Sequence, residues 1–535
     1  MAEATRWDYC LVYQLSINVY LVRTRTVEIP LTIADYLDRA ERVYGDRVAI
    51  IDEPDQPAPP LPDITYSRLA ELSRGMATGF DELGLETGAR VAMVSHNAAR
   101  LLVFLFGSSA YGRVGVPVNF RLSAPEIQYI LDHSGAEVLF IDPELAELHG
   151  SFNVKHQFVV GPESDQIFIE GGIPKPWTPD ESATATINYT SGTTARPKGV
   201  EMTHRNIWLN ASIFGWQAGV SDRDVYLHTL PMFHCNGWGM PYAMTGMGGQ
   251  HIVLRQVNGQ EILERIQKHG ITLLCGAPAV ITAVLDAAAD WDGEIPGAGK
   301  MRIVVAGAPP PTQLIARVET ELNWEFIQIY GLTETAPLLT MNRSRSEWDH
   351  LDPYERAVKL SRAGAPALGV ELSTSNNGEL LARSNHVLKS YWSQPEATEE
   401  ALANNWFHTG DGATISDDNY ATITDRKKDV IISGGENVSS IEVEDALFSH
   451  TAVAEVAVIG VPDEKWGETV KALVVVTDNS VSEQELIDHC RELLAHYKCP
   501  TSVEFRDELA RTATGKLQKF KLRAPYWEHM DRQVN

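Results

Sequence analysis

The sequence is short of cysteine, of positive charge and of long apolar runs, and each shortage excludes a class of protein. It has 5 cysteines in 535 residues and no CxxC pair, so neither a disulfide framework nor a cysteine-ligated zinc site is predicted, and a reducing cytoplasm is expected. Its 45 basic residues against 71 acidic ones give a net charge of −26, which argues against nucleic acid as a partner. Without a run of 18 apolar residues, no transmembrane helix is expected.

The remaining composition is typical of a large globular enzyme. Apolar residues make up 44% and charged residues 22% of the chain. One hydrophobic core rarely serves 535 residues, so two or more domains are expected. Residues 10–22 are apolar but lack the basic start and cleavage site of a signal peptide. Two hypotheses stay open for residues 1–26: a strand-like extension, or a start-site artefact with the functional chain beginning near Val27, which the intact mass of the native protein would decide.

Strands and helices alternate along most of the chain. Continuous apolar strands are predicted at 48–51, 91–94, 138–141, 225–230, 271–275, 301–306 and 326–330, with helices between them. This pattern predicts an α/β fold with mostly parallel sheets. The strand over 114–118 is a weaker prediction, because Pro117 cannot donate to a ladder. After residue 364, short strands rich in turn residues indicate a small β-barrel. A charged run at 425–429 then separates a smaller region with strands and helices of its own.

A polar loop at 190–199 reads Thr-Ser-Gly-Thr-Thr-Ala-Arg-Pro-Lys-Gly. It follows a predicted strand at 185–189 and precedes a helix at 204–217, which Thr203 is expected to cap. Its hydroxyls, its backbone N–H groups and Lys198 can wrap an anion such as a triphosphate. The order Lys198-Gly199 differs from the Gly-Lys-Ser/Thr of a P-loop. A plain surface turn is the alternative, and it leaves the density of hydroxyls unexplained.

This loop resembles the signature Thr-Ser-Gly-Ser/Thr-Thr-Gly-x-Pro-Lys-Gly of the adenylate-forming superfamily, which includes acyl-CoA synthetases, luciferases and peptide-synthetase adenylation domains. Ala195 departs from it, because the family usually has glycine there. The resemblance spans about residues 31–519. It implies an N-terminal extension at 1–30, an adenylation domain at 31–427, and a mobile α+β C-terminal domain at 428–535 on a hinge. It also implies that ATP, Mg²⁺ and CoA take part in the reaction. The loop residues that it implies bind ATP are Thr190, Ser191, Gly192, Thr193, Thr194 and Lys198.

A second motif, Tyr-Gly-Leu-Thr-Glu-Thr at 330–335, follows a predicted strand. An aromatic ring, a glycine and a carboxylate at a strand end are typical of a nucleotide site. The resemblance implies that Tyr330 stacks on adenine beside Gly331 and that Thr333 reaches phosphate. It also implies that Glu334 and Thr190 hold Mg²⁺, an ion that prefers one or two carboxylates plus phosphate oxygens.

Some segments gain a role only from the resemblance. Without it, the run at 425–429 reads as a solvated face, and the glycine-containing turn at 307–309 has no functional weight. With it, Asp411 and Arg426 bind ribose, Lys428 is the hinge and Lys516 is the catalytic lysine of adenylation. The backbone of Gly307, Ala308 and Pro309 then lines the nucleotide and acyl pockets, and Gly434, Gly435 and Glu436 approach CoA.

His234 lies in the run Pro-Met-Phe-His-Cys-Asn-Gly-Trp at 231–238. A lone histidine among apolar residues is more often structural, and an adjacent His-Cys pair is badly spaced for a metal. The resemblance places His234 against the acyl group. The expected pocket is apolar, which favours an acyl or aryl acid over a polar amino acid; its residues are Phe233, His234, Trp238, Met240, Ala277, Val280, Ala306 and Leu338.

The resemblance therefore implies an ATP-dependent carboxylic acid–CoA ligase with Lys516, Glu334, Thr190 and His234 as catalytic residues. A medium- or long-chain fatty acid is the first expectation for the substrate, and a short-chain, methylthio- or aromatic acid is the second. The sequence also leaves open an acyl-AMP ligase that loads a carrier protein, a luciferase-like oxygenase and a non-catalytic nucleotide-binding protein. A homodimer is left open as well.

Overall fold

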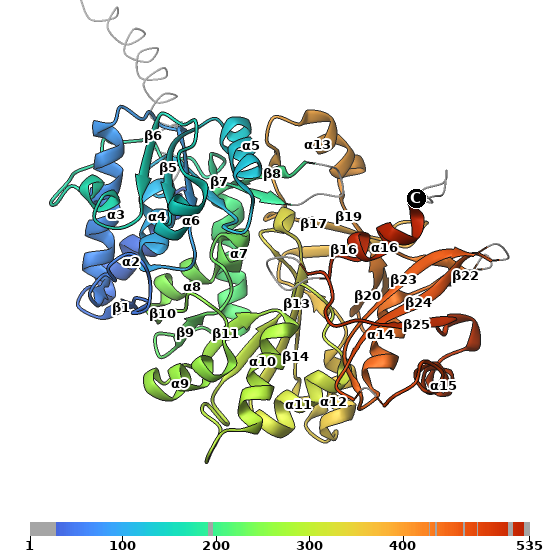
Figure 1. The fold of residues 1–535 in the computed structure, drawn as a ribbon. Coiled ribbons are helices and arrows are strands. Elements are labelled where there is room, and N and C mark those ends of the chain that lie inside the picture. The colour runs from blue at the N-terminus through green and yellow to red at the C-terminus, as the bar shows by residue number, and fades with distance from the viewer. Residues whose placement is uncertain are drawn as a thin grey trace, which may run out of the picture.

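The computed structural model describes residues 28–190, 196–426, 429–433, 436–463, 466–478, 480–511 and 517–528. Figure 1 shows a large N-terminal domain with a smaller C-terminal domain packed along one side. Within these ranges no helix is long and apolar enough to cross a membrane.

The first sheet of the large domain has seven strands in the order β18-β8-β7-β4-β3-β5-β6. Strands β3, β4, β5, β6 and β7 are parallel to one another, while β8 runs antiparallel to β7 and β18 runs antiparallel to β8. The bounds are β3 (Arg90–Val94), β4 (Val114–Val118), β5 (Ala136–Ile141), β6 (His156–Val159), β7 (Thr184–Thr190), β8 (Lys198–Thr203) and β18 (Ser390–Tyr391).

Strand β4 lies inside this sheet despite Pro117. On its β3 side, five residue pairs run from Arg90↔Val114 to Val94↔Val118, whereas its pairing with β7 is confined to Gly115↔Thr186. A proline here gives up fewer ladder bonds than in a strand paired fully on both sides. The weaker prediction of this strand is therefore confirmed.

The second sheet has nine strands in the order β15-β14-β13-β12-β11-β9-β10-β1-β2. The run from β13 to β1 is parallel, and β2, β14 and β15 are antiparallel. The bounds are β1 (Val48–Ile51), β2 (Ile64–Thr65), β9 (Val225–His228), β10 (Gln250–Val253), β11 (Leu273–Gly276), β12 (Arg302–Val305), β13 (Glu325–Gly331), β14 (Leu338–Arg343) and β15 (Ala365–Pro366).

Helices pack against these sheets, and their apolar faces contribute to three clusters. Their bounds are α2 (Ala34–Tyr44), α3 (Tyr66–Glu82), α4 (Ala99–Ser109), α5 (Ala124–Ser134), α6 (Pro143–His149), α7 (His204–Ala218), α8 (Met240–Met247), α9 (Gly259–His269), α10 (Pro278–Ala289), α11 (Thr312–Leu322), α12 (Pro353–Leu360) and α13 (Pro395–Ala401).

Buried charges join the two sheets near the ends of β1, β5 and β10. The Arg255 guanidinium donates to both carboxylate oxygens of Asp142, at 2.8 and 3.0 Å, and its backbone N–H donates to Glu53 at 2.9 Å. Asp142 follows β5 of the first sheet, whereas Glu53 and Arg255 follow strands of the second. Removing one partner of such a group would leave a buried charge unpaired, at a cost of about 3–5 kcal/mol. The network therefore holds the two sheets in one arrangement.

The short strands predicted after residue 364 form a four-stranded antiparallel sheet, in the order β16-β17-β19-β20. The bounds are β16 (Val370–Thr374), β17 (Glu379–Ser384), β19 (Phe407–Ile415) and β20 (Ala421–Arg426). This sheet lies between the large parallel sheets and the C-terminal domain (Figure 1).

The C-terminal domain has a sheet and a core of its own. Its sheet has the order β22-β21-β24-β23, with β25 paired to β24. Buried Val443, Val458 and Leu486 belong to its core. The fold class predicted from the sequence is confirmed, while the boundary at 427/428 stays a prediction. The bounds are β21 (Ile431–Ser433), β22 (Glu436–Val438), α14 (Ser440–Phe448), β23 (Val453–Asp463), β24 (Gly467–Val476), α15 (Glu483–Leu493), β25 (Ser502–Phe505) and α16 (Lys519–Trp527).

Candidate functional site

Three neighbouring parallel strands, β11, β12 and β13, end at one edge of the second sheet. Gly276 pairs with Val305, and the N–H of Ala306 donates to the carbonyl of Gly276 at 3.2 Å. Ala277 and Ala306 are therefore close to each other, as the predicted pocket requires. The next strand, β13, brings Tyr330 to the same edge. In open α/β sheets, ligands bind at the carboxyl ends of the strands.

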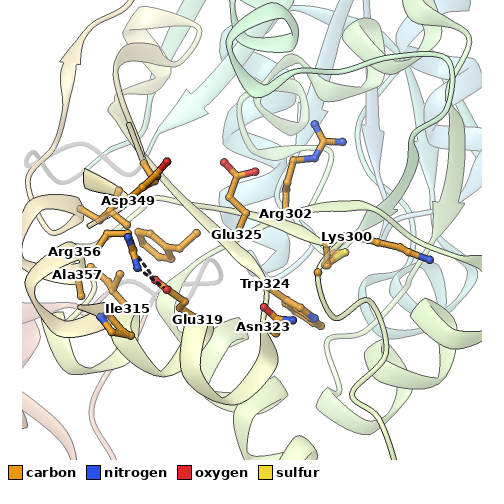
Figure 2. A pocket seen from close by; sticks show the side chains of 16 residues that line it. Lys300, Arg302, Ile315, Glu319, Asn323, Trp324, Glu325, Asp349, Arg356 and Ala357 are labelled. Carbon is orange, nitrogen blue, oxygen red and sulfur yellow. Dashed lines mark hydrogen bonds and ion pairs between the residues drawn. The ribbon is translucent and has the colours of Figure 1, made fainter. Parts of the chain in front are cut away.

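The opposite ends of the same strands carry a hollow with a volume of about 360 Å³ (Figure 2). Arg302 and Glu325, the first residues of β12 and β13, line it. Part of its charged lining is already paired, since Arg356 and Glu319 lie 2.9 Å apart. This hollow is therefore distinct from the edge that carries Ala306 and Tyr330.

Gly331 and Gly307 are the two glycines whose geometry matters at this edge. A Cβ on Gly331 would lie 1.6 Å from the carbonyl oxygen of Pro337, so a larger residue would push β14 away from β13. Gly307 has φ +94° with open space at its Cβ position, and the next residue but one, Pro309, is exposed. The backbone of the turn at 307–309 is thus accessible to a flat ligand, which glycine permits.

Tyr330 and Asp411 meet across two sheets. The Tyr330 hydroxyl donates to the Asp411 carboxylate at 2.7 Å, and Asp411 is only 7% exposed. Strand β19 is irregular here, with Gly410 at φ +74°, and such bulges re-aim side chains near active sites. The backbones of Asp411 and Arg426 are paired between β19 and β20. The structure therefore brings together Tyr330, Asp411 and the backbone of Arg426, which the resemblance assigns to adenine and ribose.

Lys198, Tyr391 and Glu334 form a second group. The Tyr391 hydroxyl donates to the Glu334 carboxylate at 2.9 Å, and the Lys198 ammonium lies 4.7 Å from the centre of the Tyr391 ring. The pKa of Tyr391 is raised, mainly because the side chain is buried and also because the Glu334 carboxylate lies next to it, so the phenol stays a donor. Thr190 belongs to the same place, because its backbone pairs with that of Lys198 at the ends of β7 and β8. Tyr391 is not predicted from the sequence, since no motif around it stands out.

This group fits a magnesium ion that is bound together with a triphosphate. No cluster of three or more histidine, cysteine or acidic side chains suited to hold a metal occurs among the described residues. Mg²⁺ rarely uses such a cage and takes one or two carboxylates plus phosphate oxygens. The Glu334 carboxylate would supply the protein ligand, while the Tyr391 hydroxyl fixes its orientation.

We expect Tyr391→Phe to raise the Mg²⁺ concentration needed for half-maximal pyrophosphate release by about tenfold, because a lost partner of a metal-binding carboxylate typically costs 10- to 100-fold. Phenylalanine keeps the ring beside Lys198 and removes only the hydroxyl that contacts Glu334. The exposed Tyr354 offers a matched control, Tyr354→Phe. An unchanged magnesium titration in Tyr391→Phe would show that the hydroxyl does not position Glu334.

His234 begins a turn with unusual backbone geometry, labelled η2 (His234–Gly239). Cys235, Asn236, Gly237 and Trp238 all have φ between +47° and +59°, so they form a left-handed turn. Only glycine adopts this region without strain, and strained backbone persists only where its surroundings hold it.

Buried side chains hold this turn in place. The Asn188 amide donates to the Asn236 side chain at 3.2 Å and to the carbonyl of Phe233 at 3.3 Å. Asn236 in turn donates to Thr186 at 3.0 Å. Since Thr186 and Asn188 belong to β7, the strand that leads into the loop at 190–199 also fixes the turn after His234.

The turn also lies beside the Glu334 group. The Cys235 thiol is 3.9 Å from the carbonyl of Thr333, at the start of the short helix η3 (Thr333–Thr335). The pKa of the Cys235 thiol is raised, mainly because the side chain is buried and also because Glu334 is nearby. The thiol is therefore neutral and packs in the core rather than acting as a nucleophile. The His234 segment and the Glu334 segment therefore occupy one neighbourhood, as the resemblance implies.

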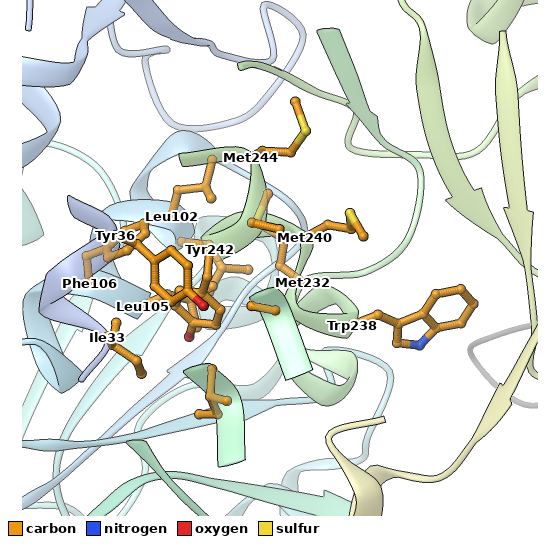
Figure 3. Packing of buried hydrophobic residues seen from close by; sticks show 14 of the residues in the cluster. Ile33, Tyr36, Leu102, Leu105, Phe106, Met232, Trp238, Met240, Tyr242 and Met244 are labelled. Atoms are coloured by element: carbon orange, nitrogen blue, oxygen red, sulfur yellow. The ribbon is translucent and has the colours of Figure 1, made fainter. Parts of the chain in front are cut away.

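Trp238 ends the turn and is 4% exposed. Figure 3 shows its indole apart from the group around Tyr242 and Phe106 that packs α4 against α8. Asn210 of α7 donates to the Trp238 carbonyl at 3.2 Å and accepts from the Leu338 N–H at 3.1 Å. One buried amide thus holds two of the predicted pocket residues.

Eight predicted site residues lie outside the described residues, namely Ser191, Gly192, Thr193, Thr194, Lys428, Gly434, Gly435 and Lys516. Their roles stay predictions. Near them, Glu436 is an exposed residue of β22, and Arg511 pairs with Leu517 across the segment that contains Lys516.

Known proteins resemble this chain over most of its length. A family model described as AMP-binding enzyme matches residues 37–392, and one described as AMP-binding enzyme C-terminal domain matches residues 442–516. The chain is similar to 2-methylpropanoate–CoA ligase of Humulus lupulus, with 36% identity over 92% of this chain and 95% of that protein. It is 35% identical to peroxisomal acetate/butyrate–CoA ligase of Arabidopsis thaliana, over 92% of this chain and 94% of that protein. Its structure is similar to the crystal structure of an anthranilate CoA ligase in complex with anthranoyl-AMP, with a TM-score of 0.82 and 25% identity over 93% of this chain and 98% of that one.

Proposed function

Because the chain belongs to the family of AMP-binding enzymes, and is an ATP-dependent acid–CoA ligase, we propose that its acid is a short-chain or aromatic one. Three of the similar proteins are named for 2-methylpropanoate, for acetate and butyrate, and for anthranilate. The prediction of a medium- or long-chain fatty acid is not confirmed and becomes the alternative. ATP, Mg²⁺ and CoA take part in the reaction.

The observation that carries the choice of acid is the position of Trp238. Its backbone is held by the left-handed turn and by Asn210, and the residue is 4% exposed, so close packing limits the movement of the large indole. We assign this ring to one wall of the acyl pocket, with Ala277 and Ala306 on the neighbouring strand ends. A rigid wall limits depth, and closed pockets discriminate by about 10- to 200-fold for each methylene that does not fit.

In the first half-reaction, a carboxylate oxygen of the acid attacks the α-phosphorus of ATP. The new oxygen–phosphorus bond forms as the bond from the α-phosphorus to the bridging oxygen breaks, and pyrophosphate leaves. Asp411 and Tyr330 would hold the nucleoside, while Lys198 and Lys516 would donate to the oxygens that gain charge. The Glu334 carboxylate, oriented by the Tyr391 hydroxyl, would hold Mg²⁺, and the ion would supply further positive charge to the phosphates.

In the second half-reaction, the thiolate of CoA attacks the acyl carbonyl of the adenylate. The carbon–sulfur bond forms, the bond from the acyl carbon to the phosphate oxygen breaks, and AMP leaves. We propose that the C-terminal domain turns about Lys428 between the two steps, which removes Lys516 and presents Gly434 and Gly435 to CoA. Such a conformational step completes each site in turn.

A location in the cytoplasm stays a prediction, because several relatives are named peroxisomal. The absence of a nucleic-acid partner and the homodimer are likewise untested expectations.

The substrate prediction is tested by measuring kcat/KM for pyrophosphate release with ATP, Mg²⁺ and CoA. The acids compared are acetate, butyrate, 2-methylpropanoate, benzoate, decanoate and palmitate. We expect the best short or aromatic acid to exceed palmitate by at least about tenfold, since the extra methylenes do not fit. A maximum at decanoate or palmitate would contradict this proposal and restore the fatty-acid alternative.

A further inference from the structure

The helix α11 begins without a capping side chain of its own. Its first residue is Thr312, and the residue before it is Pro311, which offers no side-chain acceptor to the free N–H groups of the first turn. Asp445 of the C-terminal domain supplies the acceptor. One carboxylate oxygen accepts from the Thr312 N–H at 2.8 Å, and the other accepts from the Thr312 hydroxyl at 3.1 Å.

This contact joins the two domains. Asp445 lies on α14, whose other face packs in the core of the C-terminal domain through Val443 and Leu447. Three residues after Asp445, Phe448 packs both against that core and against the large-domain cluster that contains β12 and α11. Helix α14 therefore forms part of the surface by which the small domain contacts the large one.

The docked position also keeps part of the small domain away from the site. Strand β22 lies at the outer edge of the molecule, on the side away from the large sheets (Figure 1). Its residues Glu436 and Asn437 are exposed. The described strand next to the proposed CoA-contacting glycines thus faces solvent, an arrangement that is compatible with the proposed first half-reaction.

Asp445 lies between the turn at 307–309, which is predicted to line the nucleotide pocket, and the predicted hinge at Lys428. Thr312 follows the turn at 307–309 by three residues, through Pro310 and Pro311. At the other side, α14 starts at Ser440, whose N–H donates to the Asp425 carboxylate at 2.9 Å, and Asp425 is the first residue of the charged run that contains Lys428. Rotation of α14 about that run would separate Asp445 from Thr312.

We propose that Asp445 is a positioning residue for adenylate formation. By capping α11 next to the nucleotide turn, it holds the small domain in the docked position, and it releases α11 when the domain turns for thioester formation. This role rests on the proposed two-step function. Asp445 acts through domain position and contacts no substrate.

The variant Asp445→Ala tests this role. Alanine favours a helix interior, so α14 keeps its structure while the cap on α11 is lost. We expect ATP–pyrophosphate exchange to fall about fivefold, while thioester formation from supplied acyl-adenylate and CoA stays unchanged or rises. Asp488→Ala on α15, an exposed acidic residue of the same domain, is the matched control and leaves both rates unchanged.

Two further variants test whether the hydrogen bonds of Asp445 to α11 cause the effect. Asp445→Asn retains a cap acceptor and should restore most of the exchange rate. Thr312→Val removes the hydroxyl but not the N–H, and should give a smaller loss that does not add to that of Asp445→Ala. Equal losses in both half-reactions, or none in either, would overturn the role of Asp445. If the wild-type chain exchanges no pyrophosphate with any acid, the proposed function is what fails, and the role of Asp445 falls with it.

Discussion

Lys516→Ala lowers the rate of acyl-adenylate formation by about 100- to 1,000-fold and leaves thioester formation from supplied acyl-adenylate close to the wild-type rate. One donor to the charge that develops in a transition state is typically worth this much. The resemblance assigns that donor to Lys516, and the second half-reaction proceeds after the small domain has turned. The measurement is ATP–pyrophosphate exchange, set beside acyl-CoA formation from purified acyl-adenylate.

The residues that flank the Lys516 segment provide a control for Lys516→Ala. Arg511 and Leu517 pair with each other, and Leu517 packs with Leu509 and Ile459 of the C-terminal domain, so the two ends of the segment are anchored there. Lys521 is an exposed lysine on the following helix, α16, and Lys521→Ala should leave both rates unchanged. Equal loss of both half-reactions in Lys516→Ala would refute the proposal that one domain position serves adenylate formation and the other serves thioester formation.

Glu334→Gln is expected to lower the rate of adenylate formation by about 100-fold at 1 mM Mg²⁺. A metal ion at a phosphate contributes several kcal/mol of charge stabilisation, and each 1.36 kcal/mol is tenfold in rate. Glutamine keeps the size of the side chain and still accepts the hydrogen bond of Tyr391, so the variant isolates the carboxylate charge. Excess Mg²⁺ should recover part of the rate, because the triphosphate still provides ligands.

The matched control for this variant is Glu347→Gln. Glu347 is an exposed acidic residue on the same domain that pairs with Arg345. Its replacement should leave the magnesium titration unchanged. A Glu334→Gln enzyme with the wild-type magnesium dependence would show that the metal is held elsewhere.

The sequence predicts the layered α/β fold well where local signals agree. Thr203 is expected to cap a helix, and its hydroxyl accepts from the Asn206 N–H at 3.1 Å at the start of α7. The sequence does not predict strand β8, because the segment after Lys198 has few apolar residues and is defined by its pairing with β7 and β18. Its pairing makes the loop at 190–199 the connection of a hairpin, a fact that no local pattern contains.

The site is less predictable than the fold, because its parts are distant in the chain. The motif at 330–335 indicates a nucleotide site by itself, but only the resemblance joins Asp411 to Tyr330 there, and their hydrogen bond spans 81 residues. Tyr391 escapes prediction because its partner, Glu334, is 57 residues away. The left-handed turn after His234 escapes prediction too. Of its residues, Gly237 favours a positive φ and Asn236 tolerates one, whereas Cys235 and Trp238 do not, and buried amides hold the geometry.

The most direct test of the proposed ligase reaction follows pyrophosphate release with and without CoA, using the best acid of the panel, and identifies the product by mass spectrometry. We expect many turnovers only when CoA is present, and a product with the mass of the acyl-CoA. A single burst of pyrophosphate that CoA does not change would contradict the ligase reaction, because the adenylate would then be made for another acceptor.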